Sequence, residues 1–171
     1  MTDIAPLPLS RPVEVNSILS DGLALRVSTT DGERAELAKR FDIPGISQLE
    51  ADFSMAKKGP RVRVTGLVSG RFTQMCVLTL EPFESDFREE VDLSFDENPE
   101  KALELHPEEE APDPIIDGII DLGAVAGEFT ALALDPYPRK PGAIFEFQDK
   151  KDKMDAKPSP FGALADLKRS Q

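Results

Sequence analysis

The 171-residue sequence contains a single cysteine and a single histidine, Cys76 and His106. One cysteine cannot form an internal disulfide, which excludes a secreted scaffold held together by such bonds. The two residues together cannot supply a zinc site of the Cys₄ or Cys₂His₂ type. The first ten residues have neither a basic opening nor a sustained apolar run, and no stretch approaches the roughly 18 apolar residues of a membrane span. We therefore expect a cytoplasmic protein without a membrane segment.

Catalytic motifs are also missing, including the P-loop, the dinucleotide-binding GxGxxG pattern and the HExxH pattern of zinc proteases. His106 lies in an acidic, proline-flanked stretch that would not hold a general base in place. Cys76 has the apolar parity of a predicted strand, where a buried thiol behaves as a small hydrophobe. We predict no catalytic residue, no metal and no cofactor. An enzyme acting through Asp117, Asp121 and Glu128 is the disfavoured alternative, because acids that cap a helix or lie in its first turns have structural reasons of their own.

Basic residues are scarce where acidic ones gather, and the formal net charge is −12. Residues 81–121 contain sixteen acids against Arg88 and Lys101, so this segment carries −14 and the remainder about +2. The chain therefore lacks the basic footprint usual for an independent nucleic-acid binder. Within the segment, residues 97–114 are acidic and proline-rich, and we predict a mobile loop there.

Period-two alternation of apolar and polar residues predicts strands at about 23–27, 49–55, 62–80 and 83–95. The turn at Lys57-Lys58-Gly59-Pro60 predicts a hairpin between the second and third of these. The third run is too long for one flat strand in a protein of this size, so we expect bends or bulges at Gly66 and Gly70.

Two helices are predicted between and after the strands. Thr30 and Glu33 have the spacing of a capping box, which opens a helix that runs to about Phe41. Asp121 is the expected N-cap of a second helix with an apolar stripe, which Pro136 stops.

These elements predict an α+β fold: a curved antiparallel sheet with two main helices packed on it. Periodicity leaves open whether the sheet closes partly into a barrel. We expect a single α+β domain over residues 1–147. A charged tail over 148–171 would follow it and end in a short amphipathic segment.

One basic cluster stands out, because residues 57–71 contain no acid. Its cations could form a patch that holds phosphates without reading a base sequence. The alternative is that acids of the next strand lie opposite the arginines as ordinary cross-strand pairs. The candidate phosphate or RNA contacts are Lys57, Lys58, Arg61, Arg63 and Arg71.

The C-terminal segment is a candidate docking element. Its apolar residues could share one helical face and enter the groove of a partner, or they could dock on the chain's own domain. The residues are Phe161, Leu164, Leu167, Lys168 and Arg169.

Three stretches follow one another in a recognisable order: Gln74 to Pro82, Asp117 to Leu134, and Asp135 to Ala143 with Pro160 to Leu164. This order resembles the YceD family of bacterial proteins, also called large ribosomal RNA subunit accumulation proteins. That family shows a Cys-x-x-Cys followed by Leu-Glu-Pro, then an aspartate-leucine helix with an internal glutamate. A proline-rich turn and a closing Pro-Phe-x-x-Leu segment complete its pattern. The sequence is most similar to the alphaproteobacterial branch.

The sequence departs from that family at its thiols. Thr79 stands where many relatives have their second cysteine, and Tyr137 to Pro141 contains none of the cysteines that some members show there. The resemblance therefore implies a structural role for this region, and no metal or redox role.

The resemblance implies a non-enzymatic role in the accumulation of 23S ribosomal RNA during assembly of the large ribosomal subunit. The implied partners are ribosomal RNA or a precursor large subunit, with basic ribosomal proteins facing the acidic segment. We expect neither a membrane nor a small molecule as partner. The alternative is an acidic protein–protein adaptor that binds a basic ribosomal protein and never touches RNA.

Overall fold

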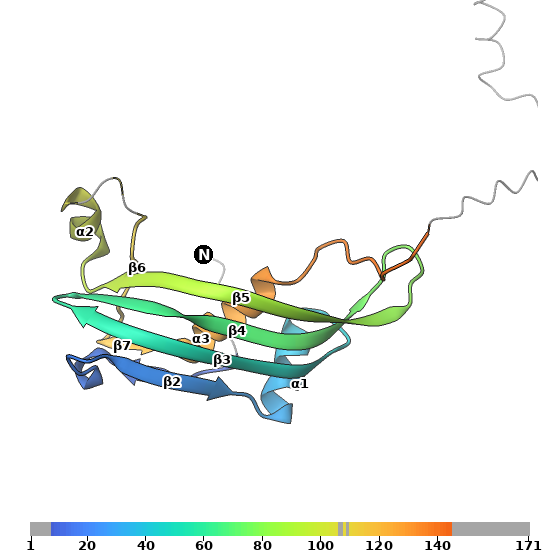
Figure 1. The fold of residues 1–171 in the computed structure, drawn as a ribbon, viewed down its shortest axis with the longest axis horizontal. Coiled ribbons are helices and arrows are strands. Elements are labelled where there is room, and N and C mark those ends of the chain that lie inside the picture. The colour runs from blue at the N-terminus through green and yellow to red at the C-terminus, as the bar shows by residue number, and fades with distance from the viewer. Residues whose placement is uncertain (1–7, 106–107, 109, 145–171) are drawn as a thin grey trace, which may run out of the picture.

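The computed structural model describes residues 8–105, 108 and 110–144 (Figure 1). The predicted C-terminal tail and its amphipathic segment lie outside these residues. Within them the chain forms seven strands, three α-helices and one 3-10 helix. In chain order they are β1 (Pro12–Glu14), η1 (Val15–Ser17), β2 (Leu23–Ser28), α1 (Asp31–Arg40), β3 (Gly45–Lys58), β4 (Arg61–Met75), β5 (Pro82–Asp96), α2 (Pro99–Leu105), β6 (Asp113–Pro114), β7 (Ile119–Asp121) and α3 (Leu122–Leu132).

Five strands form the main sheet, in the order β2-β3-β4-β5-β6. Neighbours from β2 to β5 are antiparallel, whereas β6 adds in parallel and pairs only with Phe95 and Asp96 of β5. A separate two-stranded sheet joins β1 and β7. The predicted α+β class is confirmed. The barrel-like alternative is wrong, because β2 and β6 are the two unjoined edges of the main sheet in the described part of the chain.

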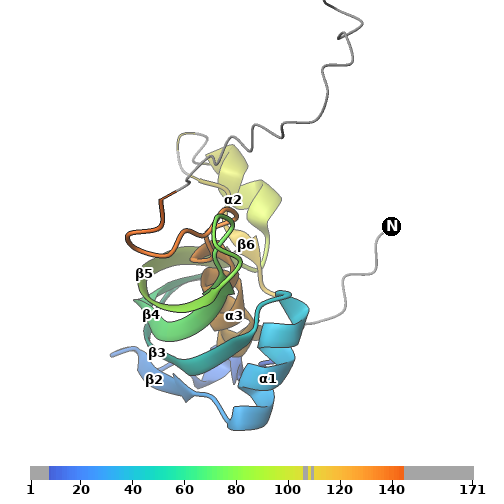
Figure 2. The same cartoon turned by 90° about the vertical axis from the view of Figure 1, so that its right-hand side faces the viewer.

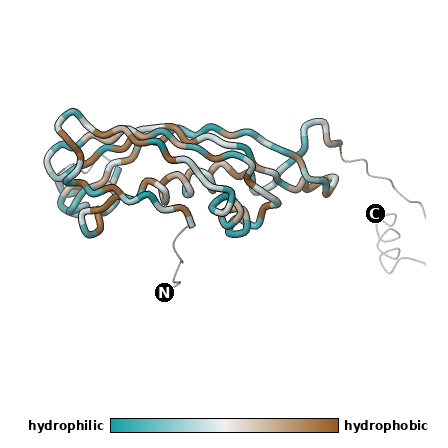
Figure 3. The backbone as a smooth tube through the Cα atoms, turned by 90° about the horizontal axis from the view of Figure 1, so that it is seen from below, coloured by the Kyte–Doolittle hydropathy of each residue, from teal (hydrophilic) through white to brown (hydrophobic). Residues whose placement is uncertain are grey.

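The core lies between the concave face of this sheet and α3, around which the sheet curves (Figure 2). Hydrophobic and hydrophilic residues alternate along the long strands (Figure 3), so Val62, Val64 and Val68 of β4 all point to the buried face. Leu122 and Val125 of α3 pack into the same cluster. Full burial of one such aliphatic side chain is worth about 1.5–3 kcal/mol, so the alternation itself determines which face of each strand turns inward.

Two glycines of β4 lie where neighbouring side chains come closest. A Cβ on Gly66 would lie 2.3 Å from the carbonyl oxygen of Asp52 and 2.8 Å from the ring of Phe53. A Cβ on Gly70 would lie 2.8 Å from the ring of Phe87. Both positions therefore require glycine because a carbonyl oxygen of β3 and an aromatic ring of an adjacent strand lie against the backbone there.

The bulges predicted at these glycines are absent, since β4 keeps a continuous register with β3 and β5 at both. The register shift lies in β3 instead, between Ile46 and Gln48. It lets Ile46 and Leu49, which are three residues apart, both reach the buried face.

Both predicted helices are confirmed. Thr30 and Glu33 form the capping box that opens α1, and Phe41 is its C-cap. The Asp121 carboxylate accepts hydrogen bonds from the amides of Gly123 and Ala124, which start α3. In each case a side-chain oxygen satisfies amides that the first helical turn leaves unpaired.

Two expectations about the secondary structure are wrong. The strand predicted to run to residue 80 ends at Met75, because Cys76 and Glu81 close a turn through a backbone hydrogen bond of 2.9 Å. The stretch 97–114 contains α2 and β6, although no regular structure was expected. Ala102 of α2 is buried, and good helix formers in this segment outweigh the repulsion among its acids. No helix in the described ranges is both long enough and apolar enough to cross a membrane.

Candidate functional site

The predicted basic cluster divides into two parts in the structure. Lys57 and Lys58 end β3 at the tip of the β3–β4 hairpin, where Gly59 turns the chain with φ of 64°. Lys58 is exposed and Lys57 is half-buried. Within the described residues neither lysine forms an ion pair, so both charges at the hairpin tip are available to a ligand.

The three arginines of β4 are held by acids of β5. Each guanidinium reaches a carboxylate across the strand pair, and in two of the pairs both carboxylate oxygens accept hydrogen bonds. The contacts are Arg63 Nη2 to Asp92 Oδ2 at 2.6 Å, Arg71 Nε to Asp86 Oδ1 at 2.6 Å, and Arg61 Nε to Asp96 Oδ2 at 3.8 Å.

The pKa values of two of the paired aspartates reflect their arginine partners. The hydrogen bonds from the arginines, with their charge, lower the pKa of Asp86 and of Asp92. Arg61 and Arg71 are also ten residues apart on one strand, roughly 33 Å, so they cannot contact one phosphate together. The arginines therefore form the cross-strand pairs that were the alternative, and within the predicted cluster Lys57 and Lys58 are the cations without an ion pair among the described residues.

The lone thiol lies at the turn after β4, and it is fully buried. The backbone amide of Lys140 donates a hydrogen bond to Cys76 Sγ at 3.3 Å. Hydrogen bonds from the Thr79 side chain, the Lys140 amide and the turn backbone together lower the pKa of Cys76 to about 7. Thr79, at the position where many relatives have a second cysteine, is thus a hydrogen-bond donor to the remaining sulfur.

This turn and the proline-rich segment 135–140, distant in sequence, are fastened to each other. Backbone, side-chain and ionic contacts contribute, which gives the region a structural role. The contacts beyond the thiol are Val77 N to Pro138 O at 2.9 Å, Gln74 Nε2 to Asp135 O at 3.0 Å, and Lys140 Nζ to the Glu81 carboxylate at 3.0 Å.

Asp121, one of the acids of the disfavoured enzyme hypothesis, has a full set of structural partners. Its carboxylate accepts hydrogen bonds from Ser10 Oγ and from the amide of Arg11, both at 2.6 Å, as well as from Gly123 and Ala124. Partial burial raises the pKa of Asp121, but these hydrogen bonds outweigh it and the net shift is downward. Such a carboxylate stays ionised and occupied, so it is poorly placed to take up a proton.

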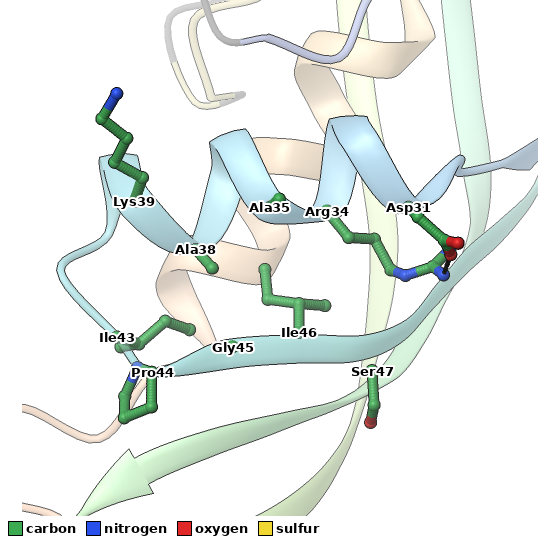
Figure 4. A pocket seen from close by; sticks show the side chains of 10 residues that line it. All are labelled: Asp31, Arg34, Ala35, Ala38, Lys39, Ile43, Pro44, Gly45, Ile46 and Ser47. Carbon is green, nitrogen blue, oxygen red and sulfur yellow. Dashed lines mark hydrogen bonds and ion pairs between the residues drawn. The ribbon is translucent and has the colours of Figure 1, made fainter.

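A hollow of about 410 Å³ lies between α1 and the start of β3 (Figure 4). Ala38, Ile43 and Ile46 line it, and Lys39 is directed away from it. The Arg34 guanidinium in its wall already pairs with Asp31 and donates to the Thr29 carbonyl oxygen at 2.7 Å. The Arg34 charge is therefore already engaged within the protein.

A second groove, which the sequence patterns did not predict, lies between the end of β5, the 113–120 segment and α3. It has a volume of about 460 Å³. Its signal in the sequence is the run Asp113-Pro-Ile-Ile-Asp-Gly-Ile-Ile-Asp121, in which pairs of isoleucines alternate with aspartates. Adjacent isoleucines break the apolar–polar alternation that predicts a strand with one buried face, because successive side chains of a strand point in opposite directions. The pattern therefore does not show which of these residues line a groove.

Other predicted positions lie outside the described residues: His106 and the segment with Phe161, Leu164, Leu167, Lys168 and Arg169. Within the described ranges, no three side chains of histidine, cysteine, aspartate or glutamate come together as a metal site.

One comparison with known proteins gives a match. A family model described as "Large ribosomal RNA subunit accumulation protein YceD" matches residues 64–168, more than half of the chain. The matched range starts in β4 and includes the Cys76 turn and all of α3. No curated protein and no solved structure matches the chain significantly.

Proposed function

Because the chain belongs to the YceD family, we propose that it supports the accumulation of 23S ribosomal RNA during assembly of the large ribosomal subunit, in the bacterial cytoplasm. The family match over residues 64–168 is the observation that carries this proposal. The chain would act by binding and not by catalysis. The buried Cys76 thiol and the fully hydrogen-bonded Asp121 carboxylate support that reading.

The proposal is tested in the native host by removing the protein and measuring the ratio of 23S to 16S ribosomal RNA, together with the yield of large subunits on sucrose gradients. We expect 23S RNA and large subunits to fall relative to small subunits, and the full-length chain to restore them. An unchanged ratio would contradict the proposed function.

For direct RNA contact, the hairpin tip with Lys57 and Lys58 is the best candidate. Both lysines lack an ionic partner among the described residues, whereas the arginines of β4 are already paired. Ammonium groups at an exposed tip can bind phosphates and release the counterions of the nucleic acid. Each such contact makes the slope of log binding constant against log salt concentration more negative by about 0.9.

The variant that tests the hairpin tip carries Lys57→Glu and Lys58→Glu. Its control carries Lys39→Glu and Lys101→Glu, which change the net charge equally at other exposed positions. We expect the tip variant alone to lose salt-sensitive co-sedimentation with precursor large subunits. Equal co-sedimentation of both variants would exclude the tip as the RNA contact.

The second candidate function is an adaptor that binds a basic ribosomal protein without touching RNA. The pairing of the β4 arginines favours it, because Arg61, Arg63 and Arg71 already have carboxylate partners with which a phosphate would have to compete. Nuclease treatment of isolated complexes distinguishes the two functions. Complexes that persist without RNA indicate the adaptor, and the C-terminal segment from Phe161 to Arg169 is then a further candidate docking element.

A further inference from the structure

The groove of about 460 Å³ beside α3 combines an apolar floor with exposed aliphatic walls. Leu93 and Phe95 of β5 and Val125 of α3 line its base. Ile116 and Ile119 line its side and are 67% and 40% exposed. Figure 1 shows β6 beside the C-terminal end of β5. Large aliphatic side chains that remain in water around one hollow are typical of a surface that a partner covers.

The acids of this groove differ from those of the sheet face. Asp113, Asp117 and Glu128 line it together with the hydrogen-bonded Asp121, and none of the four forms an ion pair within the described part of the chain. By contrast, Asp86 and Asp92 on the sheet each have an arginine. The groove thus gathers negative charge that no side chain of the described fold neutralises.

The electrostatic cost of this arrangement is visible at one residue. Burial raises the pKa of Glu128, and the charge of Asp113 raises it further. A cation bound beside these carboxylates would favour the ionised form of Glu128 and so oppose both effects. The aliphatic side chains beside these carboxylates fit the stem of a lysine or arginine side chain, whose charged end would then reach the acids.

The geometry points to this acidic groove as the docking site for a basic, amphipathic segment of a partner protein. The partner would place an aliphatic side chain against Ile116 and Ile119, and lysine or arginine side chains against Asp113, Asp117 and Glu128. This inference deepens the proposed function and rests on it, since assembly of a large subunit brings the chain to basic polypeptides. Carboxylates in this number repel phosphate, so the groove suits a protein and not RNA.

The chain's own tail is a poorer occupant on charge. Residues 145–171 contain six basic and five acidic residues, so the tail is nearly neutral and matches a rim of three carboxylates weakly. Partner recognition is therefore the occupancy we test, and tail docking is an outcome that would overturn it.

The test uses the purified full-length chain and a fluorescent amphipathic peptide built only of leucine and lysine, with binding followed by anisotropy. Ile116→Ser should weaken binding by about tenfold or more, since an aliphatic contact is lost. Its matched control is Leu132→Ser, which removes an equally exposed aliphatic side chain, 75% exposed, outside the groove lining. The control should bind within about twofold of the unaltered chain, because it removes no groove contact.

A second pair of variants separates the groove from general charge attraction. The groove variant replaces Asp113 and Asp117 by Asn and Glu128 by Gln. Its control replaces Glu14, Glu36 and Glu90 by Gln, which changes the net charge equally outside the groove lining. We expect the groove variant to weaken peptide binding much more than the control. Equal weakening in the two variants, or an unaffected Ile116→Ser, would overturn the inference. Thermal melts of each variant check that the fold is kept.

A last variant addresses the tail. If Leu164→Ser with Leu167→Ser strengthens peptide binding by tenfold, the chain's own tail occupies the groove and the partner proposal is wrong. Unchanged binding supports it. All of these measurements use purified protein and do not depend on the cellular level of 23S RNA, so failure of the groove and failure of the proposed function are read separately.

Discussion

Replacement of Glu33 by Gln should destabilise the fold measurably, because one carboxylate joins two parts of the chain. Glu33 Oε1 accepts a hydrogen bond from Arg11 Nη1 at 2.8 Å, and Oε2 accepts from Arg11 Nη2 at 3.1 Å and from the amide of Thr30 at 2.8 Å. Arg11 also donates to the carbonyl oxygen of Ser28 at 2.9 Å. The pair therefore fastens the N-terminal segment to β2 and to the start of α1.

The size of the effect follows from the carboxylate's titration. The Arg11 guanidinium and the Thr30 backbone lower the pKa of Glu33 from 4.5 to about 2. At about 1.4 kcal/mol per pH unit this shift sets a ceiling near 3.5 kcal/mol. The Glu33 and Arg11 side chains are 21% and 34% exposed, so solvent screens the pair and the expected loss is about 1–2 kcal/mol.

Urea denaturation of Glu33→Gln and the unaltered chain at pH 7 gives the difference directly. A lowered folded-state pKa contributes stability that is complete above about 4.5 and is lost as the pH falls through about 2. The two proteins should therefore converge toward pH 2. Glu36→Gln, at an exposed position of the same helix, is the control and should shift stability by less than about 0.5 kcal/mol. Equal stability at pH 7, or a gap that persists at pH 2, would refute the reasoning.

Two further predictions concern β4 and the turn after it. Gly66→Ala should lower Tm sharply, because the new Cβ would lie 2.3 Å from the Asp52 carbonyl oxygen, whereas Gly32→Ala, with nothing within 4 Å, should leave Tm unchanged or raise it. A Gly66→Ala protein as stable as the parent would show that the strands are not in close contact there. For Cys76 the folded-state pKa of about 7 lies below the ordinary 9.0, so the thiolate contributes stability that is complete above pH 9 and lost as the pH falls through 7. Cys76→Ala should remove this rise between pH 7 and 9 in denaturation curves, and parallel pH profiles would contradict it.

Elements set by local chemistry could be predicted from the sequence. The capping box of Thr30 and Glu33 and the N-cap at Asp121 depend on side chains a few residues apart, and both were found where expected. The inward parity of β4 also followed from alternation, whereas Cys76, predicted on the same grounds to be buried, is buried by the turn after β4 and the 135–140 segment. What these features share is a signal contained within one element.

Features that depend on pairing between elements could not be predicted in the same way. The role of Gly66 requires the ring of Phe53, which lies on a different strand. The choice between a free basic patch and cross-strand pairs required the register that places Arg71 opposite Asp86. The groove beside α3 was missed because three separate segments form it, and none of them alone shows a hollow.

The way β6 joins the sheet has a consequence for solubility. It pairs only with Phe95 and Asp96, so within the described residues no strand covers the outer edge of β5 from residue 83 to 94. A bare edge of that length invites another chain to extend the sheet, and closely spaced like charges discourage this. Asp86 and Asp92 are paired with arginines, so Glu84 and Glu90, which form no ion pair among the described residues, are the β5 charges placed to discourage such pairing, whatever the partner is.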